Sequence, residues 1–277
     1  MKNQHVLSGV ISAAVALGAA NATAQQTAAQ INGTSTTTGV ASGTTVTYGV
    51  SGNYPVITSI VEQPGTFNGK TYTSWTFLAQ DSSGSMEIFG SASVLTTLGF
   101  TPAVGDAIQV SGTYSPFHSI AELGTLTSIS LESAGNSVGS PITGTLSSLN
   151  SPTFSVGGSI LPESLAGTLV QLDDVTISGQ TAGETFGIAN LTLTATDSTG
   201  SEALYYYPTS FSLANQNLFG QTIPTGPVDI VGIASDYNGT TPEFVPLSIT
   251  AVPEPATLSL CGAGAALALF VGRRRKA

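Results

Sequence analysis

The chain has 277 residues, of which only 8% are charged, and its 16 acidic side chains outnumber its 6 basic ones to give a net charge of −10. This length accommodates one large or two small domains. So few Lys and Arg residues exclude an extended phosphate-binding surface for DNA or RNA, and a single cysteine excludes a disulfide framework.

The N-terminus has the pattern of a secretory signal. Lys2 and His5 precede an apolar run over residues 6–20, and the small residues Ala22 and Ala24 follow it. A basic start, an apolar run and an Ala-x-Ala end are typical of a signal peptide that is removed on export. We therefore predict a signal peptide over residues 1–24, with cleavage after Ala24.

Export removes most of the positive charge. Lys2 lies in the predicted signal and four basic residues lie at 273–276, so that Lys70 alone remains between Gln25 and Val252 beside fifteen acidic residues. The net charge of that segment is −14, which favours solubility and repulsion from polyanions. Because Cys261 lies outside it too, the exported segment has no disulfide and no cysteine metal site.

The composition after the signal predicts an all-β protein. Residues 25–53 are rich in Thr, Gly, Ala and Gln, and we expect a flexible lead-in with one edge strand at 44–48. From Tyr54 onward, short β-type runs alternate with Gly, Pro, Asn and Asp-Ser turns. No amphipathic helix longer than about ten residues is visible, which excludes a βαβ architecture.

An internal repeat divides the chain into two modules. Asp81-Ser82-Ser83-Gly84 matches Asp197-Ser198-Thr199-Gly200, and the run 105–112 matches the run 226–232 with one residue fewer. The repeat predicts a first module over 54–132, a linker over 133–159 and a second module over 160–251. A short helix is expected in each, at 91–98 and 212–219. The predicted strands are 55–62, 75–80, 85–89, 107–114 and 123–131, then 168–177, 191–196, 202–206, 228–235 and 243–251.

Five strands with a helix between the third and fourth follow the order of an OB-fold barrel. The two repeated motifs resemble those of OB-like modules beside catalytic domains in secreted bacterial nucleases and related surface proteins. The resemblance implies two tandem OB-like five-stranded barrels. A single large β-sandwich is the structural alternative.

Few residues are candidates for chemistry. His118 is the only histidine of the exported segment, so a histidine-based triad has one possible member and a histidine-rich metal site has none. Asp81 and Asp197 each open a turn that Gly closes, and such turns form without a ligand; calcium is the functional alternative. We predict no catalytic residue, no cofactor and no metal, with Asp81 and Asp197 as weak calcium candidates.

Aromatic residues mark a candidate ligand surface. OB folds bind ligands on strands two and three and on the loops after strands one and four. Those elements carry Phe67, Tyr72, Trp75, Phe117 and His118, which suit the face of a sugar ring or a peptide. The alternative is that Trp75 and its neighbours are barrel core.

The C-terminus contains three distinct segments, one after the other. Val252-Pro253-Glu254-Pro255 is followed by an uncharged apolar segment, 256–272, and by Arg273-Arg274-Arg275-Lys276. Seventeen uncharged residues lie at the lower limit for a bilayer span, and the basic end is expected in the cytoplasm. The arrangement over 252–277 resembles the PEP-CTERM sorting signal of Gram-negative bacteria. An ordinary membrane anchor is the alternative.

The resemblance implies an export route and a partner. The tail would enter the inner membrane transiently, an exosortase would cleave near the Pro-Glu-Pro motif, and the product would reach the cell surface or an exopolysaccharide matrix. Two functional hypotheses follow. The first is a non-catalytic surface or matrix protein that binds exopolysaccharide or another envelope glycan, and the second is an accessory binding module of a secreted hydrolase or nuclease system.

Overall fold

The computed structural model describes residues 24–34, 37–67, 69–116, 121–149, 154–156, 159–161, 168–187, 189–206, 218–237 and 241–252. The predicted signal peptide up to Thr23, most of the predicted helix 212–219 and the apolar segment 256–272 lie outside these ranges. Within them, no helix has both the length and the apolar character needed to cross a bilayer.

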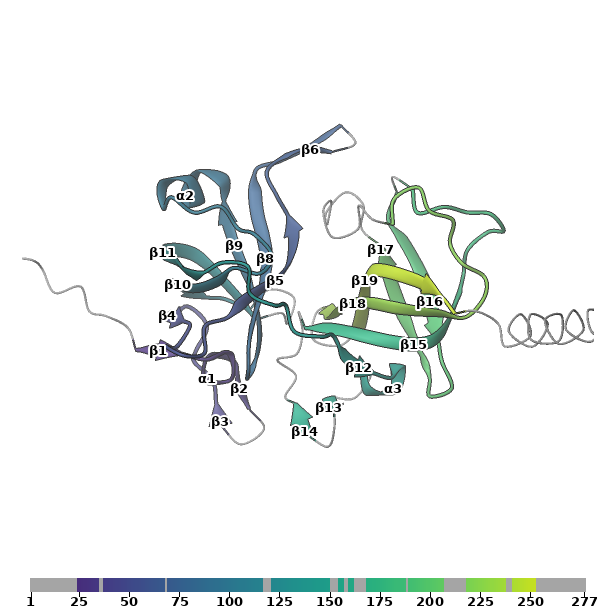
Figure 1. Ribbon diagram of the computed structural model, residues 1–277, viewed down its shortest axis with the longest axis horizontal. Helices are drawn as coiled ribbons and strands as arrows, with labels where there is room; N and C mark the ends of the chain where they lie inside the picture. The colour runs from purple at the N-terminus through teal and green to yellow at the C-terminus, as the bar shows by residue number, and fades with distance from the viewer. Residues whose placement is uncertain are drawn as a thin grey trace, which may run out of the picture.

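The ten predicted strands and the first predicted helix occur in the predicted order, together with further short elements (Figure 1). The first half contains strands β1 (Gln25–Gln26), β2 (Gly33–Thr34), β3 (Thr37–Thr38), β4 (Thr45–Tyr48), β5 (Val56–Glu62), β6 (Gly65–Phe67), β7 (Lys70–Tyr72), β8 (Ser74–Asp81), β9 (Gly84–Ser91), β10 (Ala107–Tyr114) and β11 (Glu122–Ser133), with helices α1 (Ala28–Asn32) and α2 (Ala92–Thr97). The second half contains β12 (Ile142–Gly144), α3 (Leu146–Leu149), β13 (Phe154–Val156), β14 (Ser159–Leu161), β15 (Leu169–Ser178), β16 (Leu191–Thr196), β17 (Ser201–Tyr206), β18 (Val228–Tyr237) and β19 (Thr241–Ala251).

Each half forms a closed five-stranded barrel. In the first, β5 pairs with β8, then β9, β11 and β10, and the pairing of Ala107 with Val56 closes the ring. In the second, β15, β16, β17, β19 and β18 follow the same order, and β15 pairs with β18. The third and fifth strands are parallel in both barrels, and the order is that of the OB fold. The prediction of two all-β OB-like barrels is confirmed, and the single sandwich is wrong.

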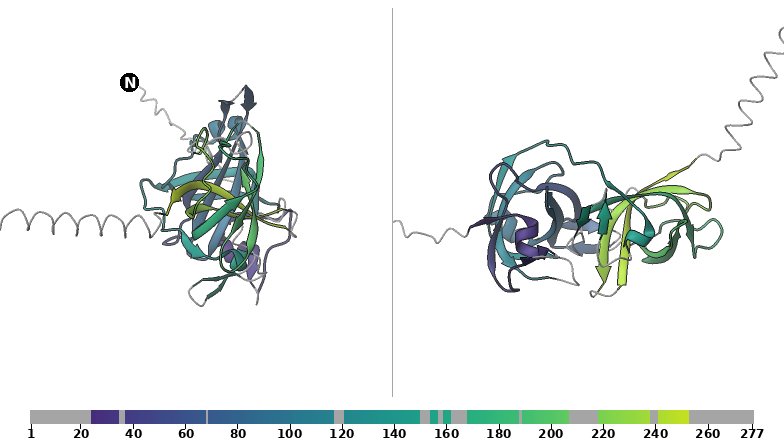
Figure 2. Two further views of the ribbon diagram at one scale, coloured as in Figure 1. Left: turned by 90° about the vertical axis from the view of Figure 1, so that its right-hand side faces the viewer. Right: turned by 90° about the horizontal axis from the view of Figure 1, so that it is seen from below.

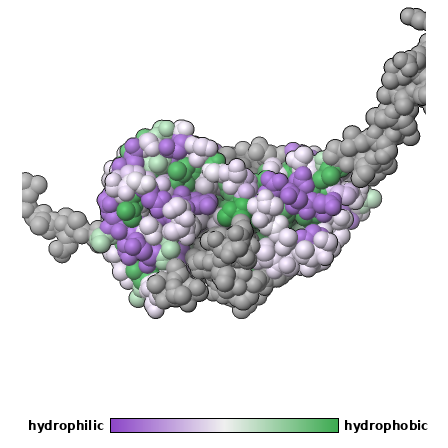
Figure 3. All heavy atoms as spheres, turned by 60° about the horizontal axis from the view of Figure 1, so that its bottom comes forward, coloured by the Kyte–Doolittle hydropathy of each residue, from purple (hydrophilic) through white to green (hydrophobic). Residues whose placement is uncertain are grey.

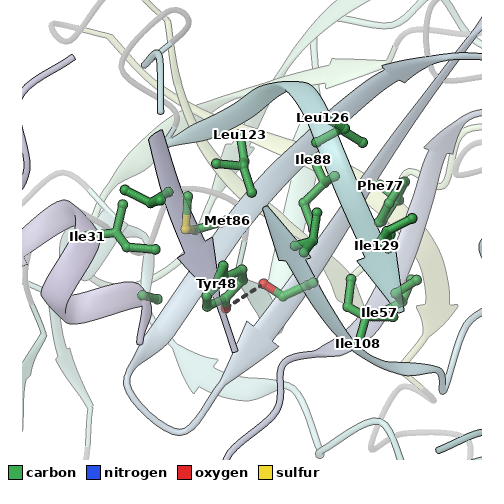
Figure 4. Close-up of a cluster of buried hydrophobic side chains, with 14 of the residues drawn as sticks. Ile31, Tyr48, Ile57, Phe77, Met86, Ile88, Ile108, Leu123, Leu126 and Ile129 are labelled. Carbon is green, nitrogen blue, oxygen red and sulfur yellow. Dashed lines mark hydrogen bonds between the residues drawn. The ribbon is translucent and has the colours of Figure 1, made fainter. Parts of the chain in front are cut away.

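The first barrel begins earlier than the sequence suggested. The predicted lead-in, 25–53, contains β1, which pairs in parallel with β4, and helix α1. Ile31 and Tyr48 from this segment are fully buried, and the Tyr48 hydroxyl donates to the Ala79 carbonyl at 3.1 Å (Figure 4). The segment was predicted as flexible because a five-residue helix and small polar residues give almost no hydrophobic periodicity.

The second barrel likewise includes part of the predicted linker, 133–159. Strand β12 pairs in parallel with β15, and Leu146 and Leu149 of helix α3 lie in the core of the second barrel. What joins the two barrels is therefore the short stretch between β11 and β12. This stretch, 134–141, belongs to no helix or strand.

Gly112 and Gly232, the last residues of the matched runs 105–112 and 226–232, lie where two strands pass close to each other. A Cβ atom at Gly232 would lie 2.4 Å from the Val245 carbonyl oxygen and 2.6 Å from the Phe244 ring. One at Gly112 would lie 2.6 Å from the Gly124 carbonyl oxygen. The repeat therefore preserves a close approach of the fourth strand to the fifth.

We expect Gly232→Ala to destabilise the second barrel by about 1–3 kcal/mol, because inserted core atoms displace backbone and an aromatic ring. Urea unfolding monitored by circular dichroism measures this change. Gly226→Ala, where nothing lies within 4 Å of the added carbon, is the matched control. Equal effects of the two substitutions would contradict the packing explanation.

The two barrels lie side by side (Figures 1, 2 and 3). Val61 and Leu78 of the first barrel form one buried cluster with Ile233 and Val245 of the second. We call this cluster the inter-barrel contact. Its residues come from β5 and β8 on one side and from β18 and β19 on the other, so the contact joins two different surfaces.

Candidate functional site

The turn that begins at Asp81 in the first barrel is hydrogen-bonded to the start of helix α1, which precedes it in the chain. The Asp81 carboxylate accepts hydrogen bonds from Ser83 N at 2.7 Å and Gly84 N at 3.1 Å within its turn. Its other oxygen accepts from Ala28 N at 2.9 Å, and Ala29 N donates to the Ser83 hydroxyl at 3.0 Å. The turn thus satisfies two N–H groups at the start of α1 that have no partner inside the helix.

The second barrel repeats this arrangement. Asp197 accepts from Leu146 N at 2.9 Å, from Thr199 N at 2.6 Å and from Gly200 N at 2.9 Å. Ser147 N donates to the Thr199 hydroxyl at 3.1 Å. Burial raises the pKa of Asp197, but these N–H donors and the Thr199 hydroxyl lower it more, so the net pKa lies below its usual value.

These contacts bear on the weak calcium prediction. Both carboxylates are surrounded by N–H donors, which stabilise an anion and do not leave oxygen pairs for a cation. In the described part of the chain, no three His, Cys, Asp or Glu side chains gather into a metal-binding group. We therefore interpret Asp81 and Asp197 as the residues that fasten α1 and α3.

The predicted aromatic surface lies in several environments. Tyr72 is buried, and the half-buried Trp75 packs against the first core. Phe67 ends β6, whose hairpin with β7 projects from the barrel in Figure 1. Phe117 and His118 lie outside the described residues. A ligand on these residues stays a prediction, and for Trp75 the core alternative matches its position.

On the first barrel, the surface that OB folds use for ligands is partly covered. Phe77 and Ala79 of β8 lie in the core, so Leu78 between them points outward. Leu78 is nevertheless only 2% exposed, because it lies in the inter-barrel contact. The second barrel therefore occupies part of the first barrel's outer face.

Two carboxyl groups meet on the same outer face. Glu87 of β9 is opposite Leu78 of β8 on one side and opposite Glu122 of β11 on the other. Glu87 is buried, and this desolvation, together with the charge of Glu122, the hydrogen bond that protonated Glu87 donates to Glu122 and the charge of Glu62, raises the pKa of Glu87 to about 8. Burial also raises the pKa of Glu122. The pair therefore holds a proton at neutral pH.

The corresponding face of the second barrel is open and carries hydroxyl groups. Strand β16 alternates buried Leu193 and Ala195 with exposed threonines, and its neighbours β15 and β17 continue the pattern in register. We call this surface the hydroxyl face. It consists of Thr176, Ser178, Thr192, Thr194, Thr196, Ser201 and Tyr205.

The hydroxyl face forms rows across three strands. Thr176 lies opposite Thr196, which lies opposite Ser201. The Thr196 and Ser201 hydroxyls are 2.9 Å apart. Thr192 lies opposite Tyr205, which is half-buried, whereas the next residue Tyr206 is fully buried. None of these side chains is ionisable near neutral pH, so the surface offers donors, acceptors and one aromatic ring without charge.

The hydroxyl face was not among the surfaces predicted from the sequence. Its signal was present, because Thr192, Thr194 and Thr196 alternate with apolar residues as in a half-exposed strand. What the sequence lacked was the pairing that adds Thr176 and Ser201 from β15 and β17 to the same rows.

Comparisons with known proteins identify the tail. Residues 251–276 match the PEP-CTERM protein-sorting motif, so the chain carries an exosortase sorting signal and is an export substrate. No curated protein matches the chain.

Comparisons with solved structures find distant likenesses. One, titled "Structural mimicry for functional antagonism", has 12% identity and a TM-score of 0.35 and covers 74% of this chain and 90% of the other. A murine DNA-binding protein bound to double-stranded DNA has 11% identity and a TM-score of 0.35, covering 72% and 99%. A replication protein A heterotrimer bound to single-stranded DNA has 10% identity and a TM-score of 0.31, covering 78% and 50%. At these scores the barrel assignment depends on the strand pairing alone.

Proposed function

We propose that this exported protein is a non-catalytic component of the cell surface or exopolysaccharide matrix and binds a neutral polysaccharide through its hydroxyl face. The observation that carries the proposal is the uncharged array of exposed Thr and Ser hydroxyls on β15, β16 and β17. In OB folds the second and third strands, here β16 and β17, are a recurring site for oligosaccharides.

The chemistry of the face suits sugar hydroxyls. Each Ser or Thr hydroxyl both donates and accepts a hydrogen bond, as a sugar hydroxyl does. Neighbouring strands lie about 4.8 Å apart, so an extended glycan can contact several rows at once. Tyr205 provides a ring edge or face beside Thr192.

The negative charge of the exported segment favours neutral polymers over anionic ones as ligands. The segment 25–252 has fifteen acidic residues and one lysine, so it repels DNA, RNA and acidic polysaccharides at low salt. A neutral glycan meets no such repulsion. The same segment has one histidine and no cysteine, which supports a binding role without catalysis.

The test is binding of the processed, secreted protein to neutral polysaccharide purified from its host, measured by isothermal titration calorimetry. We expect the triple variant T192V/T194V/T196V to bind about tenfold more weakly or worse, since each lost hydrogen bond contributes about 0.5–1.5 kcal/mol. Valine keeps the shape of threonine and removes only the hydroxyl.

Thr143→Val is the matched control, because Thr143 is an exposed threonine on β12, outside the hydroxyl face. Its affinity should equal that of the unmodified protein. Absence of binding by the unmodified protein would refute the proposed function. Unchanged affinity of the triple variant would refute the assignment of the hydroxyl face.

A further inference from the structure

We infer that the inter-barrel contact can be exchanged between copies, so that the second barrel of one chain docks on the first barrel of another. The inference goes beyond glycan binding, because it concerns assembly of the protein itself. The partner is a second copy of this chain, and the surface is one that the chain already uses within itself.

The two sides of the contact are complementary but different. On the second barrel, Ile233 lies opposite both Leu169 and Val245 in the sheet, which makes one apolar row across β15, β18 and β19. On the first barrel the row meets Val61 and Leu78. All four cluster residues are at most 5% exposed, as expected of an apolar surface that is removed from water.

Every copy therefore carries one surface of each kind. When the barrels of a chain separate, the row of the second barrel and the outer face of the first barrel both enter water. Exchange restores the same contacts in another copy, so its free-energy cost lies only in the connection and in the association entropy. A contact between two unlike surfaces forms a closed ring of copies only if the rotation between neighbouring copies permits closure. Otherwise further copies add to the end of an open chain.

The connecting segment permits the separation. Asn136 fastens its first part to the first barrel through two hydrogen bonds to the Gly105 carbonyl, from its N–H at 2.8 Å and its side-chain amide at 2.9 Å. Residues 137–141 then run to β12 outside any helix or strand, with Ser137, Gly139 and Ser140 exposed. Because β12 pairs with β15, these five residues form the hinge.

The hinge also sets the concentration at which exchange begins. Five residues span at most about 18 Å, and a short flexible linker holds its two partners at an effective concentration on the order of millimolar. Dilute protein therefore keeps the contact within one chain. A high local concentration of the protein favours the contact between chains. A hinge that is too short for the two barrels of one chain to meet has the same effect.

Cross-linking of engineered cysteines tests the inference directly, because the segment 25–252 has no cysteine of its own. Leu78→Cys and Val245→Cys are prepared as separate single variants of the processed chain, mixed, concentrated to millimolar protein, diluted and oxidised so that cysteines brought together in the contact form a disulfide. We expect covalent dimers that contain one copy of each variant, and at least tenfold fewer when the mixture is never concentrated.

Thr143→Cys mixed with Leu78→Cys is the matched control, since Thr143 lies on the second barrel but outside the cluster. Mixed dimers in equal yield with this control, or none with Val245→Cys after concentration, would overturn the inference. Circular dichroism of each single variant verifies folding.

Deletion of Val138, Gly139 and Ser140 is a second test that leaves the cluster intact. Size-exclusion chromatography with light scattering should show the shortened chain as dimers and larger species at concentrations where the unmodified chain is monomeric. A shortened chain that remains monomeric and folded would overturn the inference. Neither test uses polysaccharide, so their outcomes are independent of the proposed function.

Discussion

Raising the pH from about 4.5 to about 8 is expected to destabilise the first barrel progressively. The pKa of Glu87 in the folded protein is raised to about 8 from 4.5, so the folded state holds a proton that the unfolded chain releases. The stabilisation is complete below the unfolded pKa and is lost as the pH rises through the folded pKa. Since one pKa unit corresponds to 1.36 kcal/mol, the total loss is about 4–5 kcal/mol.

Urea unfolding at several pH values, monitored by tryptophan fluorescence, measures this loss. Trp75 is the only tryptophan of the chain and packs against the first core, so its emission reports on the first barrel. Glu87→Gln, which keeps the shape and stays neutral, should remove the slope and be the more stable protein at pH 8. Glu132→Gln, on an exposed side chain of β11, should change neither. A slope that survives Glu87→Gln would place the titrating group elsewhere.

Replacing Asp81 with Ala should destabilise the first barrel by about 3–5 kcal/mol, because a hydrogen bond to a charged group contributes about 1.5–3 kcal/mol and several are lost together. Asp81 is only 6% exposed and accepts from Ala28, Ser83 and Gly84. Asp197→Ala in the second barrel removes equivalent bonds from a half-exposed turn, so we expect a smaller loss.

Thermal unfolding followed by circular dichroism and by Trp75 fluorescence separates the two barrels. Ser82→Ala is the control, because Ser82 is the exposed residue of the same turn and only its backbone N–H is bonded, to Asn53. A loss below 1 kcal/mol for Asp81→Ala would mean that α1 holds its place through packing of Ile31 alone.

The features that could be predicted from the sequence are those that depend on short-range patterns of residues. Strand β16 was placed at its observed bounds, and the short helix after β9 and the OB order followed from the repeat. Helices α1 and α3 were missed, since five and four residues do not establish a helical period. A signal existed, because Thr27 and Asn32 are matched by Thr145 and Asn150 with apolar residues at equivalent places.

The remaining features depend on contacts between distant residues. Ala28 and Asp81 are 53 positions apart, and the pairing of Glu87 with Glu122 arises only when β9 and β11 align in parallel. Leu78 and Ile233 occupy outward-facing positions of their strands, and nothing in the neighbouring sequence indicates that another barrel covers them. Such juxtapositions follow from barrel closure and docking, which no short stretch of sequence specifies.

The last strand of the second barrel leads directly into the sorting motif. Strand β19 ends at Ala251, where the sorting motif begins, and the Val252 N–H still donates to the Pro227 carbonyl at 3.0 Å. Along its length β19 pairs with β18 on one side and with β17 on the other. A pull on a retained C-terminus would run along β19, and the bonds of its antiparallel ladder with β18 lie perpendicular to that direction. Such a load would be shared by many bonds in shear, so we expect the second barrel to resist unravelling from its C-terminal end.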